Sequence, residues 1–161
     1  MPIKVGDHVP DATFKQLSAN GITNVDTVTL LKGKKVVLFG LPGAYTPVCS
    51  ANHLPGFVAK ADELKARGID DIVCISVNDP FVMQAWGKQH GADGKVTMLS
   101  DADGAFTRAI GLSLDLPDFG LSGRSERYSM LVEDGVVKTL NVEKTVFDHG
   151  VSSAATCMLH T

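Results

Sequence analysis

The sequence predicts an α/β protein in which a mixed β-sheet lies between helices. Its length of 161 residues corresponds to one domain, since domains commonly hold about 150 residues, and we predict a single domain over residues 1–161. Short, continuously apolar runs alternate with helical stretches, as in buried parallel strands that are joined by helices. Later in the chain, an Asp-Gly dipeptide between two apolar runs predicts a tight hairpin, which adds antiparallel strands to the sheet.

The first half of the chain is expected to form a strand–helix–strand unit. Residues 36–41 (VVLFGL) and 71–77 (DIVCISV) are predicted as central strands, because their apolar residues do not alternate with polar ones. A helix is predicted between them over residues 47–67. Pro55 lies inside this helix and should kink or interrupt it just before that position, since proline cannot donate a backbone hydrogen bond.

The second half supplies further helices and the hairpin. In chain order we expect a helix over 80–90, a strand over 95–99, a short helix over 103–110, strands over 127–133 and 136–142, and a helix from Ser152 or Ser153 to 159. Pro80 suits the first position of its helix, and Asp134-Gly135 favours a type I′ turn between the last two strands. A parallel half followed by an antiparallel hairpin and a helix predicts a thioredoxin-like fold.

The composition excludes several classes of function. The net charge of −3 offers no basic excess, which argues against nucleic acid or a membrane surface as the main partner. No apolar run approaches the roughly 18 residues of a membrane span, and residues 1–7 lack the apolar core of a signal peptide. We therefore expect a cytoplasmic protein, or a mature organellar form from which a presequence was removed. Three cysteines are too few for a disulfide scaffold, so the question is which of them reacts.

Cys49 lies where a helix is expected to begin. Thr46 suits the N-cap and Pro47 the first helical position, which makes Cys49 the third helical residue. Backbone N–H groups of the first turn lack intrahelical acceptors, so they can stabilise a thiolate together with the helix dipole. The helix also follows a buried strand and a glycine-containing loop, where open α/β sheets commonly build their sites.

The helix start alone cannot ionise such a thiol. An ordinary cysteine, with a pKa of about 8.5, is only a few per cent ionised at neutral pH, and full ionisation requires roughly 3–4 kcal/mol. A helix N-terminus supplies about 0.3–2 kcal/mol, so a cation must help. Of the four arginines, Arg67 lies about 27 Å along the same helix and is excluded. Arg108, Arg124 and Arg127 remain, and Arg127 opens a predicted strand, which is a more rigid platform than a loop.

Residues 42–50 (PGAYTPVCS) resemble the active-site signature of peroxiredoxins. Further segments resemble the type II, peroxiredoxin-5-like, branch of that family: GKKVVLF (33–39), HLPGF (53–57), SVNDPFV (76–82) and RYSM (127–130). The resemblance covers essentially residues 3–155. It implies a thioredoxin-like fold and a thiol peroxidase that reduces hydrogen peroxide, organic hydroperoxides and peroxynitrite.

The resemblance also implies roles for individual residues. Cys49 matches the peroxidatic cysteine, which becomes a sulfenic acid that a second thiol must reduce. Thr46 matches the residue whose hydroxyl orients the thiolate and the peroxide, Pro42 the residue that shields the site, and Arg127 the activating guanidinium. The family implies no metal or other cofactor. It forms homodimers across the active-site loops, in the region of Phe119, where exposed apolar residues would fit.

The resolving thiol stays open at this point. Cys74 corresponds to the second cysteine of plant-type members, but its strand pattern equally fits a small buried hydrophobe. Cys157 lies several positions beyond the place, near Val151, where animal two-cysteine members keep their resolving residue, and packing explains it. Both are candidates for the resolving thiol. Because Cys157 departs from the position of the resolving cysteine in animal members, an external reductant is favoured: glutathione with glutaredoxin, or thioredoxin.

Other features carry weaker predictions. His53 follows Cys49 by four residues, a metal-pair spacing, but no further ligands cluster nearby, so we expect an ordinary buried histidine without a metal. Arg124 is expected in an exposed loop.

The alternative to an enzyme is a non-enzymatic redox relay or sensor, or a holdase, acting through oxidised Cys49. A papain-like hydrolase is disfavoured, because nothing marks a histidine as the base beside Cys49.

Overall fold

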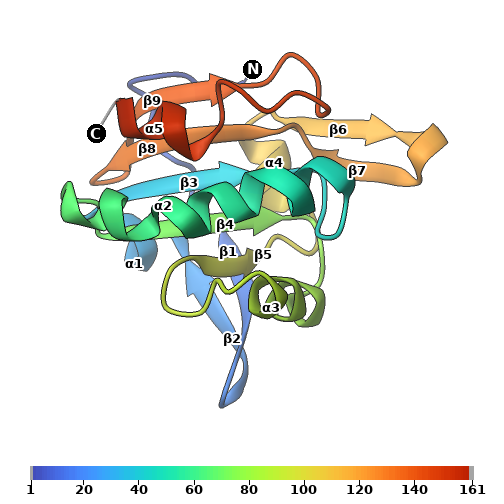
Figure 1. The fold of residues 1–161 in the computed structure, drawn as a ribbon, viewed down its shortest axis with the longest axis horizontal. Coiled ribbons are helices and arrows are strands. Elements are labelled where there is room, and N and C mark those ends of the chain that lie inside the picture. Colours follow the sequence, from blue (N-terminus) through green and yellow to red (C-terminus); the bar gives the residue numbers. More distant parts are fainter. Residues whose placement is uncertain (1, 160–161) are drawn as a thin grey trace.

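A computed structural model describes residues 2–159 of the chain (Figure 1). Residues 1, 160 and 161, the ends of the predicted domain, lie outside the described residues. The strands are β1 (Thr13–Ser18), β2 (Gly21–Asp26), β3 (Lys35–Gly40), β4 (Asp71–Ser76), β5 (Thr97–Ser100), β6 (Ser113–Leu116), β7 (Leu121–Ser125), β8 (Tyr128–Glu133) and β9 (Val136–Val142). The helices are α1 (Thr27–Leu31), the π-helical η1 (Cys49–His53), α2 (Leu54–Ala66), α3 (Pro80–Gln89), α4 (Ala105–Ala109), the 3₁₀ turn η2 (Pro117–Phe119) and α5 (Ala154–Leu159).

The predicted mixed sheet with flanking helices is confirmed. Seven strands lie in the order β2-β1-β5-β4-β3-β8-β9, with β3, β4 and β5 parallel and β8 antiparallel to β3. One face packs against α2, α3 and α5, and the other against α1 and α4. Because β3 and β4 are covered on both faces, nearly all their side chains are buried, as their continuous apolar runs predicted.

The local signals at turns and caps hold in the structure. Asp134 and Gly135 both have positive φ, at 49° and 80°, as the type I′ turn between β8 and β9 requires. Asp79 caps α3 by accepting a hydrogen bond from the Val82 N–H, with Pro80 in the first helical position. Ser153 caps α5 in the same way, accepting from the Thr156 N–H at 3.2 Å.

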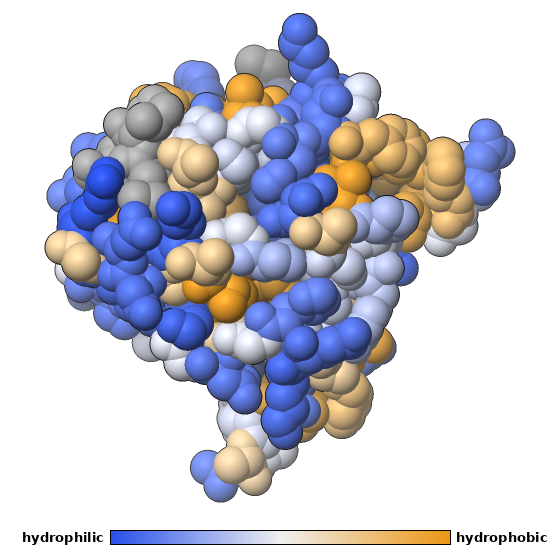
Figure 2. All heavy atoms as spheres, viewed as in Figure 1, coloured by the Kyte–Doolittle hydropathy of each residue, from blue (hydrophilic) through white to orange (hydrophobic). Residues whose placement is uncertain are grey.

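Two hairpins were not predicted from the sequence. β1 and β2 form an antiparallel pair at one edge of the sheet, and β6 and β7 form a separate two-stranded sheet. Both pairs are rich in polar residues, and within β1 and β2 only Phe14 is buried, so they lack the apolar runs that mark the central strands. The β6–β7 hairpin matters for the site, because its outer end carries apolar surface (Figure 2) and lines a pocket together with residues 42–48, which precede η1.

No helix within residues 2–159 has both the length and the apolar character that crossing a bilayer requires.

Candidate active site

The helix that carries Cys49 begins where the sequence predicted. Helical geometry starts at Pro47, and the Ser50 N–H donates to the Thr46 carbonyl at 2.9 Å, which places Thr46 at the N-cap. The Thr46 side chain does something other than capping: its hydroxyl donates to the Gly43 carbonyl at 2.8 Å. It therefore closes the loop that leads from β3 into the helix, and its oxygen keeps lone pairs for a further partner.

The predicted interruption before Pro55 takes the form of a π-helical turn. Residues Cys49–His53 are π-helical, and the Leu54 N–H bonds back to the Cys49 carbonyl, five residues earlier. The turn ends at His53, two residues before Pro55, which has no N–H to continue a regular ladder. In this wide turn the side chains of Cys49 and His53 both contact the same partner, Arg127.

Arg127 lies against the sulfur of Cys49, as the energy argument required. It immediately precedes β8, the antiparallel neighbour of β3, and its Nη2 donates to the Cys49 Sγ at 3.1 Å. Both residues are buried, with 0% of Cys49 and 1% of Arg127 exposed. The other guanidinium nitrogens are also engaged, Nε with the Val146 carbonyl at 3.1 Å and Nη1 with His53 Nδ1 at 2.9 Å.

The charge of Arg127 has no carboxylate to balance it. Within residues 2–159 the ion pairs join Lys4 to Asp7, Lys60 to Glu63 and Lys95 to Asp62, and none includes Arg127. A guanidinium stays protonated in proteins, and an isolated buried charge is costly. A thiolate on Cys49 is the anion that would compensate it, at hydrogen-bond distance.

A small apolar pocket adjoins the pair. It holds about 220 Å³ and is lined on one side by Pro42, Thr46 and Arg127. Its other walls come from the β6–β7 hairpin and the segment after β9: Leu116, Phe119, Leu121, Val146 and Phe147. The structure thus brings together all four residues that the sequence singled out: Pro42, Thr46 and Arg127 line the pocket, and Cys49 contacts Arg127.

Two loop anchors near the site were not recognised from the sequence. Arg124 lies in β7 and is half-buried, so the expectation of an exposed loop arginine is wrong; its Nη1 donates to the Pro42 carbonyl at 3.2 Å. Asn78 accepts the Ala44 N–H at 2.9 Å and the Ser76 hydroxyl at 2.6 Å. The contacts of Arg124 with Pro42 and of Asn78 with Ala44 have no local sequence signal, because these residues are 82 and 34 positions apart.

His53 is buried as expected, and both of its ring nitrogens have polar partners. Its Nδ1 faces Arg127, and its Nε2 lies 3.1 Å from the Ser152 carbonyl. Among the described residues no group of three or more histidines, cysteines and carboxylates could hold a metal ion. The spacing of four residues places the side chains of His53 and Cys49 beside one guanidinium, a role that was not predicted from the sequence.

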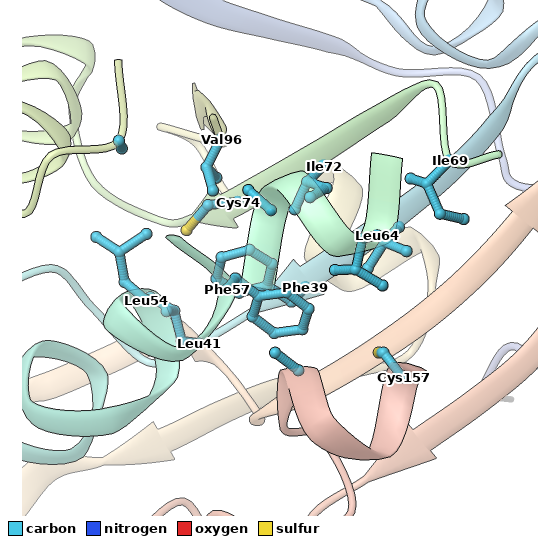
Figure 3. Packing of buried hydrophobic residues seen from close by; sticks show 14 of the residues in the cluster. Phe39, Leu41, Leu54, Phe57, Leu64, Ile69, Ile72, Cys74, Val96 and Cys157 are labelled. Carbon is cyan, nitrogen blue, oxygen red and sulfur yellow. The ribbon is translucent and has the colours of Figure 1, made fainter. Parts of the chain in front are cut away.

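Cys74 and Cys157 are free thiols packed among apolar side chains (Figure 3). Cys74 lies opposite Phe39 on the neighbouring strand, and burial, followed by the charge on Cys49, raises its pKa well above the usual value. The Cys157 thiol donates to the Ser129 hydroxyl at 3.3 Å, and burial raises its pKa as well. Raised pKa values make both thiols weak nucleophiles in this conformation.

Known proteins resemble this chain over most of its length. The family model described as Redoxin matches residues 4–156. The chain is 50% identical over 143 residues to Peroxiredoxin-2B of Arabidopsis thaliana, covering 88% of each chain. It is 52% identical over 146 residues to the chloroplastic Peroxiredoxin-2E of the same plant, covering 88% of this chain and 62% of that one.

Solved structures share the whole fold. Reduced Prx3 from Vibrio vulnificus in complex with H₂O₂ aligns with a TM-score of 0.92 at 46% identity, over 98% of each chain. Peroxiredoxin 5 from Alvinella pompejana aligns with a TM-score of 0.85 at 35% identity, over 98% of this chain and 97% of that one.

Proposed function

Since the chain belongs to the redoxin family and, within it, to the type II (peroxiredoxin-5-like) peroxiredoxins, it is a thiol-dependent peroxidase, and we propose that Cys49 is the residue its substrate oxidises. The observation that carries this proposal is the 3.1 Å contact between Arg127 Nη2 and Cys49 Sγ, with both groups buried. A buried guanidinium without a carboxylate partner among residues 2–159 favours the thiolate, which is the nucleophilic form of cysteine.

The proposed reaction is a displacement at oxygen. The Cys49 thiolate attacks one oxygen of a hydroperoxide, an S–O bond forms as the O–O bond breaks, and the electron pair leaves on the second oxygen, which takes a proton to become an alcohol or water. Cys49 becomes a sulfenic acid. The Arg127 guanidinium and the Cys49 backbone N–H supply the donors for the charge that develops on the leaving oxygen. The Thr46 hydroxyl, whose proton goes to the Gly43 carbonyl, orients the peroxide by accepting a hydrogen bond from its O–H group, and Pro42 shields the thiolate.

The substrates are hydrogen peroxide and organic hydroperoxides, with peroxynitrite as a third. The apolar pocket beside Thr46 and Arg127 supports organic hydroperoxides, because Leu116, Phe119 and Phe147 can bury an alkyl chain while the polar end faces Thr46 and Arg127. We place the protein in antioxidant defence and redox homeostasis on this basis.

The reductant is an external thiol, either glutathione with glutaredoxin or thioredoxin. The first thiol condenses with the Cys49 sulfenic acid to a mixed disulfide and releases water; a second thiol then attacks that disulfide, frees Cys49 and leaves as the oxidised disulfide. The apolar packing and raised pKa values of Cys74 and Cys157 support an external partner over an internal resolving cysteine.

The assembly is a homodimer formed across the loops around the site. Phe119 and Phe147 support this, because they are 62% and 59% exposed and their rings lie 5.5 Å apart beside the pocket. We also propose a cytoplasmic location, or an organelle for a processed form, since one relative is named as chloroplastic.

Peroxide consumption with a thiol reductant tests the proposal. Cys49→Ser should abolish turnover, whereas Cys157→Ser and Cys74→Ser, as matched controls, should retain it. Turnover that survives in Cys49→Ser would refute the assignment. Oxidation of Cys49 at the rate of a free cysteine would instead favour the redox relay or holdase.

A further inference from the structure

His53 joins the reactive pair to a second, well-anchored segment of the chain. Its ring is 0% exposed and lies between Arg127, on one side, and the Ser152 carbonyl, on the other. The displacement described above makes no use of this residue. Phe39 and Phe57 pack against the ring, with centroids 5.0 and 5.6 Å away, so its polar contacts are confined to its two nitrogens.

The two partners dictate which nitrogen carries the proton. A carbonyl oxygen only accepts hydrogen bonds, so Nε2, at 3.1 Å from the Ser152 carbonyl, must be the protonated nitrogen. A guanidinium only donates, so Nδ1, at 2.9 Å from Arg127 Nη1, must offer its lone pair. Both contacts are satisfied only by a neutral imidazole in the Nε2–H tautomer.

The Ser152 carbonyl, which accepts the Nε2–H of His53, is itself fixed in place. The Glu143 carboxylate, next to the end of β9, accepts the N–H groups of Gly150, Val151 and Ser152 at 2.9, 3.0 and 3.3 Å, and the Ser152 hydroxyl at 3.1 Å. Four donors on one carboxylate hold this turn rigidly. The Ser152 carbonyl therefore presents a fixed point to His53 from 99 residues away.

We propose that His53 is a positioning residue: the neutral imidazole, aligned by the Ser152 carbonyl, holds the Arg127 guanidinium on the sulfur of Cys49. This inference rests on the roles proposed for Cys49 and Arg127. Without the Nδ1 acceptor, the Nη1 donor of Arg127 would be buried and unpaired, and the guanidinium would turn away from its present alignment. His53 does not line the pocket, and it acts through Arg127.

Protonation of His53 would break this arrangement. An imidazolium would direct an N–H and a positive charge at the guanidinium. Burial, and then the charges of Arg127 and His149, keep the pKa of His53 well below its usual value, so the neutral form persists at physiological pH. The charged and titratable groups nearest the ring are Arg127 and His149, whose ring centroid is 5.2 Å away. Cys49, which accepts from Arg127, and Glu143, which accepts from the Ser152 N–H, lie behind the two hydrogen-bond partners of the ring.

The test reads the ionisation of Cys49 directly. Two quantities are measured for the wild type and each variant. One is the pH profile of Cys49 alkylation by iodoacetamide, followed by mass spectrometry of the Cys49 peptide. The other is the rate constant for the reaction with peroxide. His53→Leu, which removes the acceptor, should move the alkylation midpoint upward by about one pH unit and slow peroxide reduction roughly tenfold. His53→Asn, whose side-chain oxygen can replace Nδ1 as acceptor, should restore most of both.

Phe57→Leu is the matched control, since it alters packing against the same ring without touching a polar contact. The proposal is overturned if folded His53→Leu keeps the wild-type midpoint, or if Phe57→Leu moves it equally. Should His53→Leu fail to fold, nitrogen NMR of the wild-type histidines decides: a protonated Nδ1 at neutral pH contradicts the proposal. Because alkylation needs no peroxide, a shifted midpoint stands even if Cys49→Ser retains turnover, so the two proposals fail separately.

Discussion

At the scale of single residues, the site depends on one side chain with three different partners. The Arg127 guanidinium donates to a sulfur, an imidazole and a carbonyl, each through a different nitrogen. This use of a planar, forked donor explains why a lysine would not substitute for it, since an ammonium is a point charge without a fixed fork. The sequence predicted the cation, but the geometry assigns it two further contacts.

Arg127→Met should slow the reaction with peroxide about 10- to 100-fold, because a charge-assisted hydrogen bond contributes roughly 1.5–3 kcal/mol. The rate of Arg127→Lys should fall between the rates of Arg127→Met and the wild type. Stopped-flow measurement of peroxide loss checks this. Arg108→Met is the control, since Arg108 contacts the Asp103 carbonyl on the surface, away from the site. Equal rates for Arg127→Met and the wild type would contradict the role of the guanidinium.

The low pKa of His53 predicts a loss of stability in mild acid. In the unfolded chain the histidine titrates near pH 6.5, whereas the folded protein keeps it neutral well below that value. Below pH 6.5 the unfolded state therefore binds a proton that the folded state does not, and the free energy of unfolding falls as the pH falls.

Urea unfolding of the wild type and His53→Asn between about pH 7.5 and pH 5.5 measures this dependence. The slope of the free energy of unfolding against pH should be smaller in His53→Asn than in the wild type. Some slope should persist, because the pKa of His149 is also lowered, mainly by burial. Parallel slopes in the two proteins would show that His53 does not titrate as described.

At the scale of elements, prediction succeeded where local chemistry decides the structure. The continuous apolar runs of β3 and β4, the Asp134-Gly135 turn and the helix start at Pro47 all carry short-range signals. The edge hairpin β1–β2 carries none, since its stability comes from pairing along a mostly polar edge. The contacts of His53 and Arg124 join residues 74 and 82 positions apart, so only the assembled sheet reveals them.

The pairing of β3 with β8, which carries Arg127 to the site, tolerates no side chain at Gly40. A Cβ there would lie 2.2 Å from the ring of Tyr128, its buried neighbour across the two strands. Gly40→Ala should lower the free energy of unfolding by about 1–3 kcal/mol, as overpacking does. Gly56→Ala, in α2 with nothing within 4 Å of the added carbon, should instead stabilise by about 0.5–1 kcal/mol. Urea denaturation compares the pair, and equal effects would contradict the packing argument.

At the scale of the whole molecule, the sheet brings one end of β3, the segment before β8 and the turn after β9 to a single buried centre. Burial keeps water away from the Cys49 sulfur and the Arg127 guanidinium, which lie at hydrogen-bond distance from each other. Cys74 and Cys157 share an apolar cluster with Cys49 on that face of the sheet, and burial raises the pKa of both thiols.

This arrangement predicts the products of oxidation. Mass spectrometry after one equivalent of peroxide, without reductant, should find sulfenic acid on Cys49 and no internal disulfide to Cys74 or Cys157. Added glutathione should then give a mixed disulfide on Cys49. An internal Cys49–Cys74 or Cys49–Cys157 bond would instead establish a two-cysteine cycle.

The most direct test of the whole account is stopped-flow oxidation of the Cys74→Ser/Cys157→Ser variant, in which Cys49 is the only thiol. If Arg127 holds Cys49 as a reactive thiolate, this variant consumes one equivalent of peroxide in a single phase, orders of magnitude faster than free cysteine. Oxidation at the rate of an ordinary thiol would contradict the account.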